Sequence, residues 1–272
     1  MEIQNTNLIQ KRQEKNKDWW EKAPMTYEDW DKEREERMPK SKEDFLEVEF
    51  KFLETNPFLK ENFNFSLFSN KKVLEIGCGS GAASCLFAKN GANIFSVDIT
   101  QAAIDMTKKN SRLQKQKVNA LQMDAEKLNF EDETFDYLFS WGVLHHSQNP
   151  SQAFSEASRV LKVGGKGMIM VYNKNSLRYY GNGLGWLFLR GKVFRGNNLE
   201  SVQKFYTDGY YHKHFTPREL RKELEKKGLR IEGTYITHMN TQMIPYLPKK
   251  LIKLLKKNIG WLLVVKFTKI KH

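Results

Sequence analysis

The sequence predicts an α/β fold with a doubly wound, mostly parallel sheet, and three observations lead to this prediction. Between residues 72 and 172, short apolar runs typical of buried strands alternate with single segments of helical periodicity. The first strand runs directly into three glycines at alternate positions, in VLEIGCGSG. The second and third strands end in Asp98 and Asp124. Strand–helix–strand units close by right-handed crossovers, which place helices on both faces of a parallel sheet.

The predicted strands follow one another at regular intervals. Five of them lie before residue 173, at KVLEI, NIFSVD, VNALQMD, FDYLFS and KGMIMVY. Two more lie near the end of the chain, at LRIEGTYITHM and GWLLVVKFTKI. The alternation with helices therefore predicts parallel pairing among the first five strands.

Start and stop residues place the helices between these strands. One helix is predicted from Gly81 to Asn90, and Gly91 ends it. A second begins after Thr100 as N-cap, and a third runs over residues 150–163 up to Gly164-Gly165. A later helix begins at Thr216-Pro217-Arg218-Glu219, where Thr, Pro and Glu occupy the positions each favours in a first turn.

Two segments fall outside this alternation. Residues 1–70 predict a helical N-terminal extension, in which Ser41 and Asp44 form a capping box before an apolar helical face. Residues 173–215 are rich in Gly, Tyr, Arg and Asn and predict an insertion after the fifth strand. We therefore divide the chain into the extension and a domain over residues 71–272 that contains the insertion.

Composition limits the classes of protein and of partner. With 272 residues and 40% hydrophobic content, the chain can bury one sizeable core. Residues 1–150 carry 21 basic and 25 acidic residues, whereas residues 151–272 carry 24 basic and 7 acidic ones. An excess of this kind suits an anionic partner or substrate, although a generally Lys-rich chain also explains it.

Several patterns are absent from the sequence. The N-terminus lacks the apolar core of a signal peptide, and no apolar run approaches the length of a membrane span. The two cysteines, Cys78 and Cys85, predict neither a disulfide framework nor a zinc site. We therefore expect a cytoplasmic protein without a structural metal.

The glycine loop indicates a nucleotide-containing cofactor. Glycine tolerates positive φ and lets the backbone approach a ligand closely. Gly77, Gly79 and Ala82 formally fit a dinucleotide-binding pattern. However, Glu75 precedes the loop, and a carboxylate there would repel a pyrophosphate and favour a cofactor with a cationic group. At the ends of the next strands, Asp98 is suited to ribose hydroxyls and Asp124 to an adenine amino group.

The ordered motifs VLEIGCGSG, VDIT, QMDAEKL, FDYLFSWGVLHH and EASRVLKVGGKGMIMVYN resemble the class I S-adenosylmethionine-dependent methyltransferases. Within that class they are most similar to the group related to ubiquinone- and menaquinone-pathway enzymes. The resemblance covers residues 71–172 closely and residues 215–272 in general topology. It implies a Rossmann-like methyltransferase fold of seven strands, the last antiparallel. It also implies S-adenosylmethionine as cofactor and S-adenosylhomocysteine as its product.

The resemblance assigns roles by position. The cofactor-binding residues it implies are Glu75, Gly77, Cys78, Gly79, Gly81, Asp98, Ile99, Asp124, Ala125, Ser140 and Trp141. His145 and Tyr172 are candidate catalytic residues. For His145 the reason is that a neutral imidazole can act as a base. The candidate substrate-binding residues are Trp19, Trp20, His146, Arg178, Tyr179, Tyr211 and His214. The insertion is expected to cover the substrate, and Trp19-Trp20 with Tyr27 and Trp30 to close the site from the other side.

The predicted function is in-line transfer of a methyl group to a small-molecule acceptor of lipidic or anionic character. The alternatives are an RNA or protein methyltransferase that uses the basic second half, a non-catalytic S-adenosylmethionine-binding protein, and a dehydrogenase. We expect no nucleic-acid partner, because no RNA-binding module and no Pro-Pro-aromatic motif follows the fourth strand. Residues 248–258, PKKLIKLLKKN, suit either a solvated connector or a basic helix on a membrane surface. The oligomeric state stays open.

Overall fold

Seven strands form one sheet at the centre of the computed structural model, which describes residues 14–22, 24–27, 38–205, 207, 211–238 and 249–270. Within helix 249–259, the side chains of 249, 250 and 252–254 are not described. The strands are β1 (Lys72–Ile76), β2 (Asn93–Asp98), β3 (Val118–Gln122), β4 (Phe135–Trp141), β5 (Leu161–Tyr172), β6 (Leu229–Thr237) and β7 (Leu262–Lys269). Trp30, which was expected near the site, lies outside the described residues.

The strand order confirms the predicted topology. The order is β3-β2-β1-β4-β5-β7-β6, with β1 to β5 parallel and β7 antiparallel to both of its neighbours. The sheet reverses its order between β1 and β4. In open α/β sheets, ligands bind beyond the carboxyl ends of the strands at such a switch point. The glycine loop after β1 lies there.

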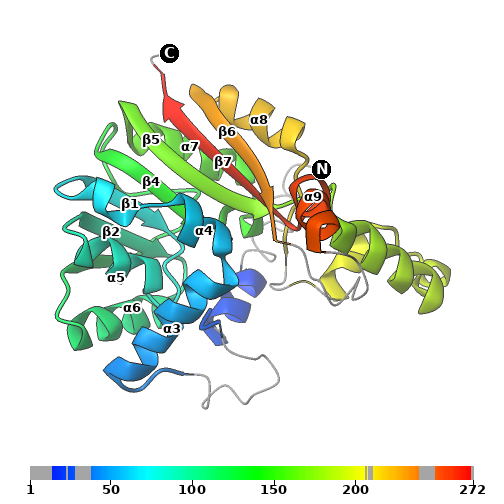
Figure 1. Cartoon of the computed structure of the whole chain (residues 1–272), viewed down its shortest axis with the longest axis horizontal. Helices are drawn as coiled ribbons and strands as arrows, with labels where there is room; N and C mark the ends of the chain where they lie inside the picture. Colours follow the sequence, from blue (N-terminus) through cyan, green and yellow to red (C-terminus); the bar gives the residue numbers. More distant parts are fainter. Residues whose placement is uncertain are drawn as a thin grey trace.

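Helices cover both faces of the sheet (Figure 1). On one face lie α3 (Lys42–Thr55), α5 (Ala82–Lys89) and α6 (Gln101–Leu113), and on the other lie α7 (Pro150–Val160) and α8 (Pro217–Glu225). Because side chains alternate along a strand, β1 supplies Val73 to the core beneath α5 and Leu74 to the core beneath α7. Glu75 therefore falls on the α5 side.

Predicted helix starts agree with the structure where a cap specifies them. The Ser41 side chain accepts from the Asp44 amide and the Asp44 carboxylate accepts from the Ser41 amide. Thr216 and Glu219 make the same reciprocal pair at α8. Thr100 caps α6. These residues satisfy backbone groups that the helix itself leaves unpaired.

The predicted end of the third helix is wrong. Instead of continuing to Gly164-Gly165, α7 ends at Val160, and β5 begins at Leu161. Leu161 is fully buried and pairs with Phe135 of β4, so its burial outweighs the helical pattern. The glycines instead lie where the register between β4 and β5 shifts, and Gly164 has a φ of 78°.

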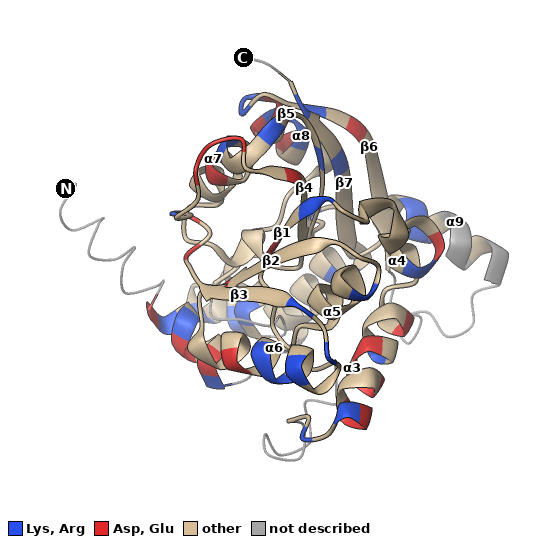
Figure 2. Cartoon of the chain, turned by 90° about the vertical axis from the view of Figure 1, so that its left-hand side faces the viewer, with Lys and Arg blue, Asp and Glu red and all other residues tan. Residues whose placement is uncertain are grey.

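The extension contributes a helix over residues 14–22, α3, α4 (Pro57–Asn62) and the short turn η1 (Phe65–Phe68). It is tied to the domain at Glu49 of α3, whose carboxylate accepts from Lys89 Nζ at 2.6 Å and from Gln114 Nε2 at 2.5 Å. Basic and acidic residues are mixed on the outer surfaces of α3, α6 and α7 (Figure 2).

The insertion consists of short helical turns, η3 (Arg178–Asn182), η4 (Gly185–Leu189), η5 (Lys192–Arg195) and η6 (Ser201–Phe205). It projects beyond the sheet on the side where α9 (Lys249–Ile259) lies (Figure 1). The structure thus shows a helix in most of the segment 248–258. Among the described helices, none combines the length and apolar character that a membrane crossing requires.

Candidate functional site

The glycine loop between β1 and α5 is built from left-handed residues. Gly77, Gly79 and Gly81 have φ angles of 85°, 52° and 76°. The amides of Gly77 and Cys78 donate to the Val97 carbonyl oxygen at 2.7 and 3.2 Å, which fixes the loop over the end of β2. Side chains with a Cβ rarely adopt these angles, so the loop conformation depends on glycine.

Asp98 joins the loop to the next helix. Its carboxylate accepts from the Gly79 amide at 3.2 Å, and from the amide and hydroxyl of Thr100 at 3.0 and 2.9 Å. Burial raises the pKa of Asp98 above its usual value, although these hydrogen bonds act in the opposite direction. The same carboxylate borders the cavity described below, so it can hold the loop and contact a ligand.

Glu75 lies beneath the loop and not in it. It is 3% exposed, and its Oε2 accepts from the hydroxyls of Ser84 and Ser96. Burial raises the pKa of Glu75 to about 8, against the effect of these hydrogen bonds. At neutral pH this site therefore favours the protonated carboxyl. Glu75 supports the turn from strand to helix without bordering the cavity.

A cavity of about 330 Å³ opens at the carboxyl ends of β1, β2, β4 and β5. The structure brings most of the predicted cofactor residues together along one side of it. These are Gly77, Gly79, Asp98, Ile99, Asp124 and Ala125, whereas Trp141, which also lines the cavity, belongs to the aromatic part described below. Its size falls within the range of small-molecule sites. Thr100, Ala103 and Met123 complete this side, which we call the cofactor side.

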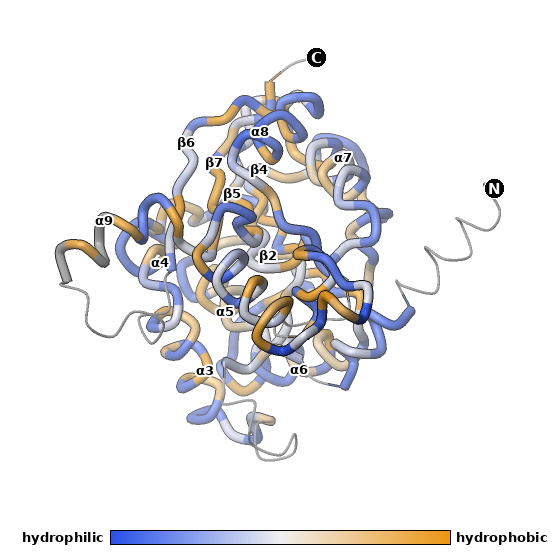
Figure 3. Tube along the Cα trace, turned by 90° about the vertical axis from the view of Figure 1, so that its right-hand side faces the viewer, coloured by the Kyte–Doolittle hydropathy of each residue, from blue (hydrophilic) through white to orange (hydrophobic). Residues whose placement is uncertain are grey.

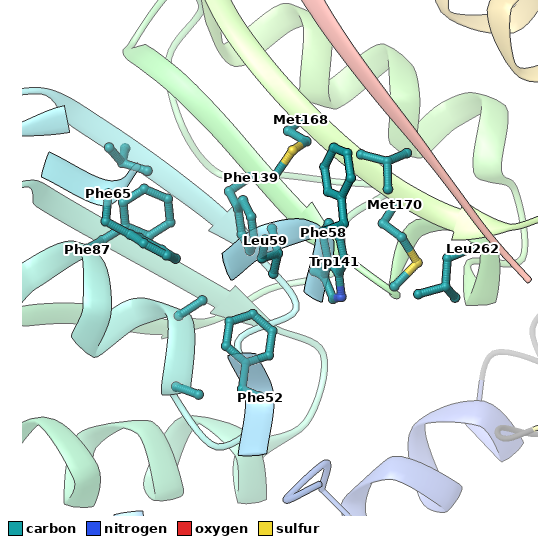
Figure 4. Packing of buried hydrophobic residues seen from close by; sticks show 14 of the residues in the cluster. Phe52, Phe58, Leu59, Phe65, Phe87, Phe139, Trp141, Met168, Met170 and Leu262 are labelled. Atoms are coloured by element: carbon teal, nitrogen blue, oxygen red, sulfur yellow. The ribbon is translucent and has the colours of Figure 1, made fainter. Parts of the chain in front are cut away.

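Aromatic and other apolar side chains form a second part of the cavity lining, which we call the aromatic side. They are Trp20, Tyr27, Trp141, Met170, Tyr172, Trp261 and Leu262. Trp141 is held by a hydrogen bond of 2.9 Å from its Nε1 to Asn56 Oδ1, and its ring stacks with those of Phe58 and Phe139. Figure 4 shows these rings together, with Met170 and Leu262 beside them. Side chains fixed in this way form a rigid wall.

His146 borders the cavity, whereas the neighbouring His145 does not. His146 Nδ1 lies 2.9 Å from the Tyr211 carbonyl oxygen, and its buried Nε2 has no hydrogen-bond partner among the residues that the structure describes. Burial lowers the pKa of His146 to about 4, so the ring is neutral at physiological pH. His145 is fully buried against Tyr172, and within the described part of the chain neither of its ring nitrogens has a hydrogen-bond partner.

The remaining predicted site residues fall into two groups, those that line the cavity and those that do not. Tyr172, Trp20 and Arg178 line it, and the Arg178 guanidinium lies 4.6 Å from the centre of the Trp261 ring. The residues that do not line it are Cys78, Gly81, Ser140, Trp19, Tyr179, Tyr211 and His214. Cys78 and Ser140 are buried, and Ser140 donates to the Ile76 carbonyl oxygen. Trp19 is 45% exposed.

Three polar residues of the extension were missed by the sequence analysis. Asn16 Nδ2 donates to the His146 carbonyl oxygen at 2.7 Å, and Asn56 holds Trp141. Glu21 accepts from the amides of Gln101 and Ala102 at the start of α6. No local pattern singles out these residues in a charged segment, because their partners lie 80 to 130 positions away.

Comparison with known proteins identifies the domain. Residues 74–169 match the family described as a methyltransferase domain. The chain is 27% identical over 161 residues to a ubiquinone biosynthesis O-methyltransferase of Coxiella burnetii, covering 59% of this chain and 64% of that protein. It is 28% identical over 203 residues to the protein of the same name from Aliivibrio fischeri, covering 72% and 80%. The chain thus spans slightly under two thirds of the length of the Coxiella relative.

A solved structure supports the fold. A S-adenosylmethionine-dependent methyltransferase from Methanosarcina mazei superposes with a TM-score of 0.54 at 21% identity, covering 79% of this chain and 98% of that one. The fold described above is thus that of a known methyltransferase structure.

The cofactor side fits S-adenosylmethionine, the cofactor of this family. Asp98 and Asp124 offer oxygens that accept hydrogen bonds from hydroxyl and amino groups, and Ile99 and Ala125 offer apolar surface for a purine ring. A Cβ on Gly79 would lie in ordinary van der Waals contact with Met25, at 3.7 Å, so Gly79 lies against Met25 in the cavity lining.

The ribose assignment of Asp98 leads to a binding prediction. We expect Asp98→Ala to weaken the affinity for S-adenosylhomocysteine about ten- to a hundredfold, since hydrogen bonds to a charged group are each worth about 1.5–3 kcal/mol. Titration calorimetry measures this change. Asp105→Ala, an exposed carboxylate on α6, serves as the control and leaves the affinity unchanged. An Asp98→Ala protein that binds as tightly as the wild type contradicts the assignment.

The loop geometry leads to a stability prediction that compares two glycines. A Cβ on Gly77 would lie 2.0 Å from Val143 Cγ2, whereas one on Gly79 meets no atom closer than 3.7 Å. Both residues have positive φ, which costs about 1–2 kcal/mol for a residue with a Cβ. Overpacking adds about 1–3 kcal/mol at Gly77 alone. Urea unfolding is therefore expected to show a larger decrease in the free energy of unfolding for Gly77→Ala than for Gly79→Ala. Equal losses would contradict the packing at Val143.

Proposed function

Because the chain carries a methyltransferase domain and belongs to the class I S-adenosylmethionine-dependent methyltransferases, we propose that it methylates an oxygen atom of a small, mostly apolar acceptor. A phenolic hydroxyl is the acceptor group that the site suits best. The names of the Coxiella and Aliivibrio relatives, both ubiquinone biosynthesis O-methyltransferases, support the choice of oxygen.

The aromatic side of the cavity supports a flat, apolar acceptor. Rings of Trp20, Tyr27, Trp141, Tyr172 and Trp261 border it, and the cavity has a volume of about 330 Å³. Aromatic walls favour planar ligands through stacked and edge-to-face contacts. This size suits a small molecule, so the proposal favours a small-molecule acceptor over the macromolecular alternatives.

His146 is the observation that carries the proposal for oxygen. A carbonyl oxygen can only accept a hydrogen bond, so the contact with Tyr211 assigns the proton of the neutral ring to Nδ1. Nε2 then carries the lone pair, and it has no partner among the described residues. A neutral imidazole with an unpartnered nitrogen, on a residue that borders the cavity, is suited to accept a proton from a hydroxyl group.

When bound, S-adenosylmethionine supplies an electrophilic methyl group on a sulfonium whose leaving group is uncharged. His146 accepts the acceptor's hydroxyl proton on Nε2, which leaves the oxygen with the electron pair it needs as a nucleophile. Trp141 and Tyr172 orient the acceptor between the cofactor side and His146. The fixed wall around Trp141 keeps the reacting oxygen in one place.

The extension and the insertion complete the enclosure in this proposal. The helix over residues 14–22 bridges the site, since Asn16 contacts the His146 carbonyl and Glu21 contacts the start of α6. The insertion contributes Arg178, which lies over Trp261. Together they exclude water from the acceptor, which strengthens the hydrogen bonds that position it. Residues 1–70 and 173–215 thus act as covers from two sides.

Two adjacent histidines provide a sharp test of this mechanism. We expect His146→Gln to lower kcat for a phenolic acceptor by about 10²- to 10⁴-fold, the usual contribution of a general base, with KM little changed. His145→Gln, whose side chain does not line the cavity, is expected to change kcat much less. Labelled cofactor and a phenol panel measure both rates, and melting temperatures check the folding of both variants.

The pH dependence of the same reaction gives a second readout. Because burial lowers the pKa of His146 to about 4, the base form is populated above that pH and is lost as the pH falls through it. The wild-type rate is therefore expected to stay level from pH 8 down to about pH 5 and to fall below that. A wild-type rate that falls through pH 6.5 would contradict the role of His146. So would a loss of activity in His145→Gln as large as that in His146→Gln.

A further inference from the structure

The charged side chains of the cavity lie at its two ends. Among the described residues that line it, Asp98 and Asp124 are acidic and Arg178 is basic. Asp98 ends β2 and Asp124 follows β3, at one edge of the strand order. Arg178 follows β5 and lies over Trp261, the residue before β7. In the strand order β2 and β7 are four positions apart, which is about 19 Å at the usual strand spacing. The acids of the cofactor side and the Arg178 cation therefore lie far apart.

An aromatic ring holds Arg178 at the cavity. The central carbon of its guanidinium lies 4.6 Å from the centre of the Trp261 ring, and both residues line the cavity. The attraction between a cation and a ring restrains the cation without neutralising its charge. Leu262, which follows Trp261, pairs with Tyr172 of β5 and lines the cavity as well. The sheet thus positions the ring, and the ring positions the guanidinium.

The positive charge of this end of the cavity comes from Arg178 and from Lys256. Burial is the largest cause that lowers the pKa of His212, to about 3, and the charge of Arg178 contributes to the same shift. His238 follows β6 and lines the cavity, and its pKa is lowered by burial and then by the charges of Lys256 and Arg178. Lys256 belongs to α9, which lies beside β6 (Figure 3). At neutral pH both imidazoles are uncharged, so the two cations determine the sign of the charge.

A row of cavity-lining rings joins the proposed base to Arg178. The ring centres of His146 and Tyr172 lie 5.7 Å apart, and those of Tyr172 and Trp261 lie 4.4 Å apart. Arg178 then lies over Trp261. All four residues line the cavity. A planar acceptor that lies along this row can therefore place its hydroxyl group at His146 and a second polar group at Arg178.

We propose that Arg178 binds a carboxylate group of the acceptor, which makes the acceptor a phenolic acid. This inference rests on the proposed function, because it takes His146 as the place where the hydroxyl group reacts. A planar guanidinium donates two parallel N–H bonds to the two oxygens of a carboxylate, a fit that a neutral amide or ester lacks. Held at both groups, the acceptor lies in one orientation, with the reacting oxygen directed to His146. Arg178 then determines specificity and takes no part in bond formation.

Two other anions suit Arg178 less well. A phosphate monoester carries a charge of nearly −2 and favours a cluster of cations, whereas the described lining of the cavity offers Arg178 as its one basic residue besides the neutral histidines. The carboxylate of S-adenosylmethionine is the second anion. The glycine loop that would hold the methionine part follows β1, three strand positions from β7. We therefore assign Arg178 to the acceptor, and the affinity for S-adenosylhomocysteine checks this assignment.

Equilibrium binding to the full chain, saturated with S-adenosylhomocysteine, tests the proposal. Wild-type protein is expected to bind 3,4-dihydroxybenzoate about ten- to a hundredfold more tightly than 3,4-dihydroxybenzamide, because hydrogen bonds between charged groups are stronger than those to a neutral group. Arg178→Gln removes this preference and leaves the affinities for the benzamide and for S-adenosylhomocysteine unchanged. Arg178→Lys keeps the charge without the planar fork and retains part of the preference.

Arg190→Gln is the matched control, because Arg190 lies 4.5 Å from the Trp186 ring in the same insertion and does not line the cavity. This variant is expected to keep the full preference for the acid. The proposal is overturned by wild-type protein that binds the acid no more tightly than the amide, or by an equal loss in Arg190→Gln. A weaker affinity of Arg178→Gln for S-adenosylhomocysteine also overturns it, since Arg178 would then serve the cofactor.

The binding measurement is separate from the test of methyl transfer. If neither compound is methylated at oxygen, the proposed function fails, whereas the preference for the acid still decides whether Arg178 binds a carboxylate. The comparison of the two compounds uses the wild-type protein, so it does not depend on the folding of any variant.

Discussion

The rest of the site depends on how the turn after β1 is held over the end of β2. Gly77 and Cys78 donate to the Val97 carbonyl oxygen, and Gly79 donates to the Asp98 carboxylate. Thr107 and Asn110 of α6 hold the loop carbonyls from the other side. A loop that contains three left-handed glycines offers few partners for its own backbone N–H and C=O groups. The contacts with β2 and α6 therefore define its shape. That shape places the cofactor side of the cavity.

The aromatic side depends on contacts between segments far apart in sequence. Asn56 of the extension holds Trp141 of β4, and Asn16 contacts the backbone of His146. The Tyr211 carbonyl oxygen, just after the insertion's helical turns, determines which nitrogen of His146 carries the proton. In the proposed reaction, the extension and the insertion therefore close the cavity and also position Trp141 and His146.

Local chemistry explains how far the sequence predicted this structure. The caps at Ser41, Thr100 and Thr216 and the glycine turn depend on neighbouring residues, and they lie where expected. The strands are also found, but β3 ends at Gln122, before Asp124, and β5 begins at Leu161, before the expected Lys166. The end of α7 was misplaced because the burial of Leu161 depends on its partner Phe135. His145 and His146 are identical in type and adjacent, so only the turn they occupy distinguishes them. Asn16, Asn56 and Trp261 carry no local signal, since their partners are distant.

The central claim, transfer of a methyl group to a phenolic oxygen, is tested most directly by locating the transferred carbon. The protein is incubated with S-adenosylmethionine carrying a ¹³C-labelled methyl group and with matched acceptors, namely a catechol, the corresponding aniline and total RNA. Product NMR then identifies the atom that carries the label. The structure predicts a labelled methoxy group on the catechol and none on the other two. Label on nitrogen, on ring carbon or in RNA would contradict it.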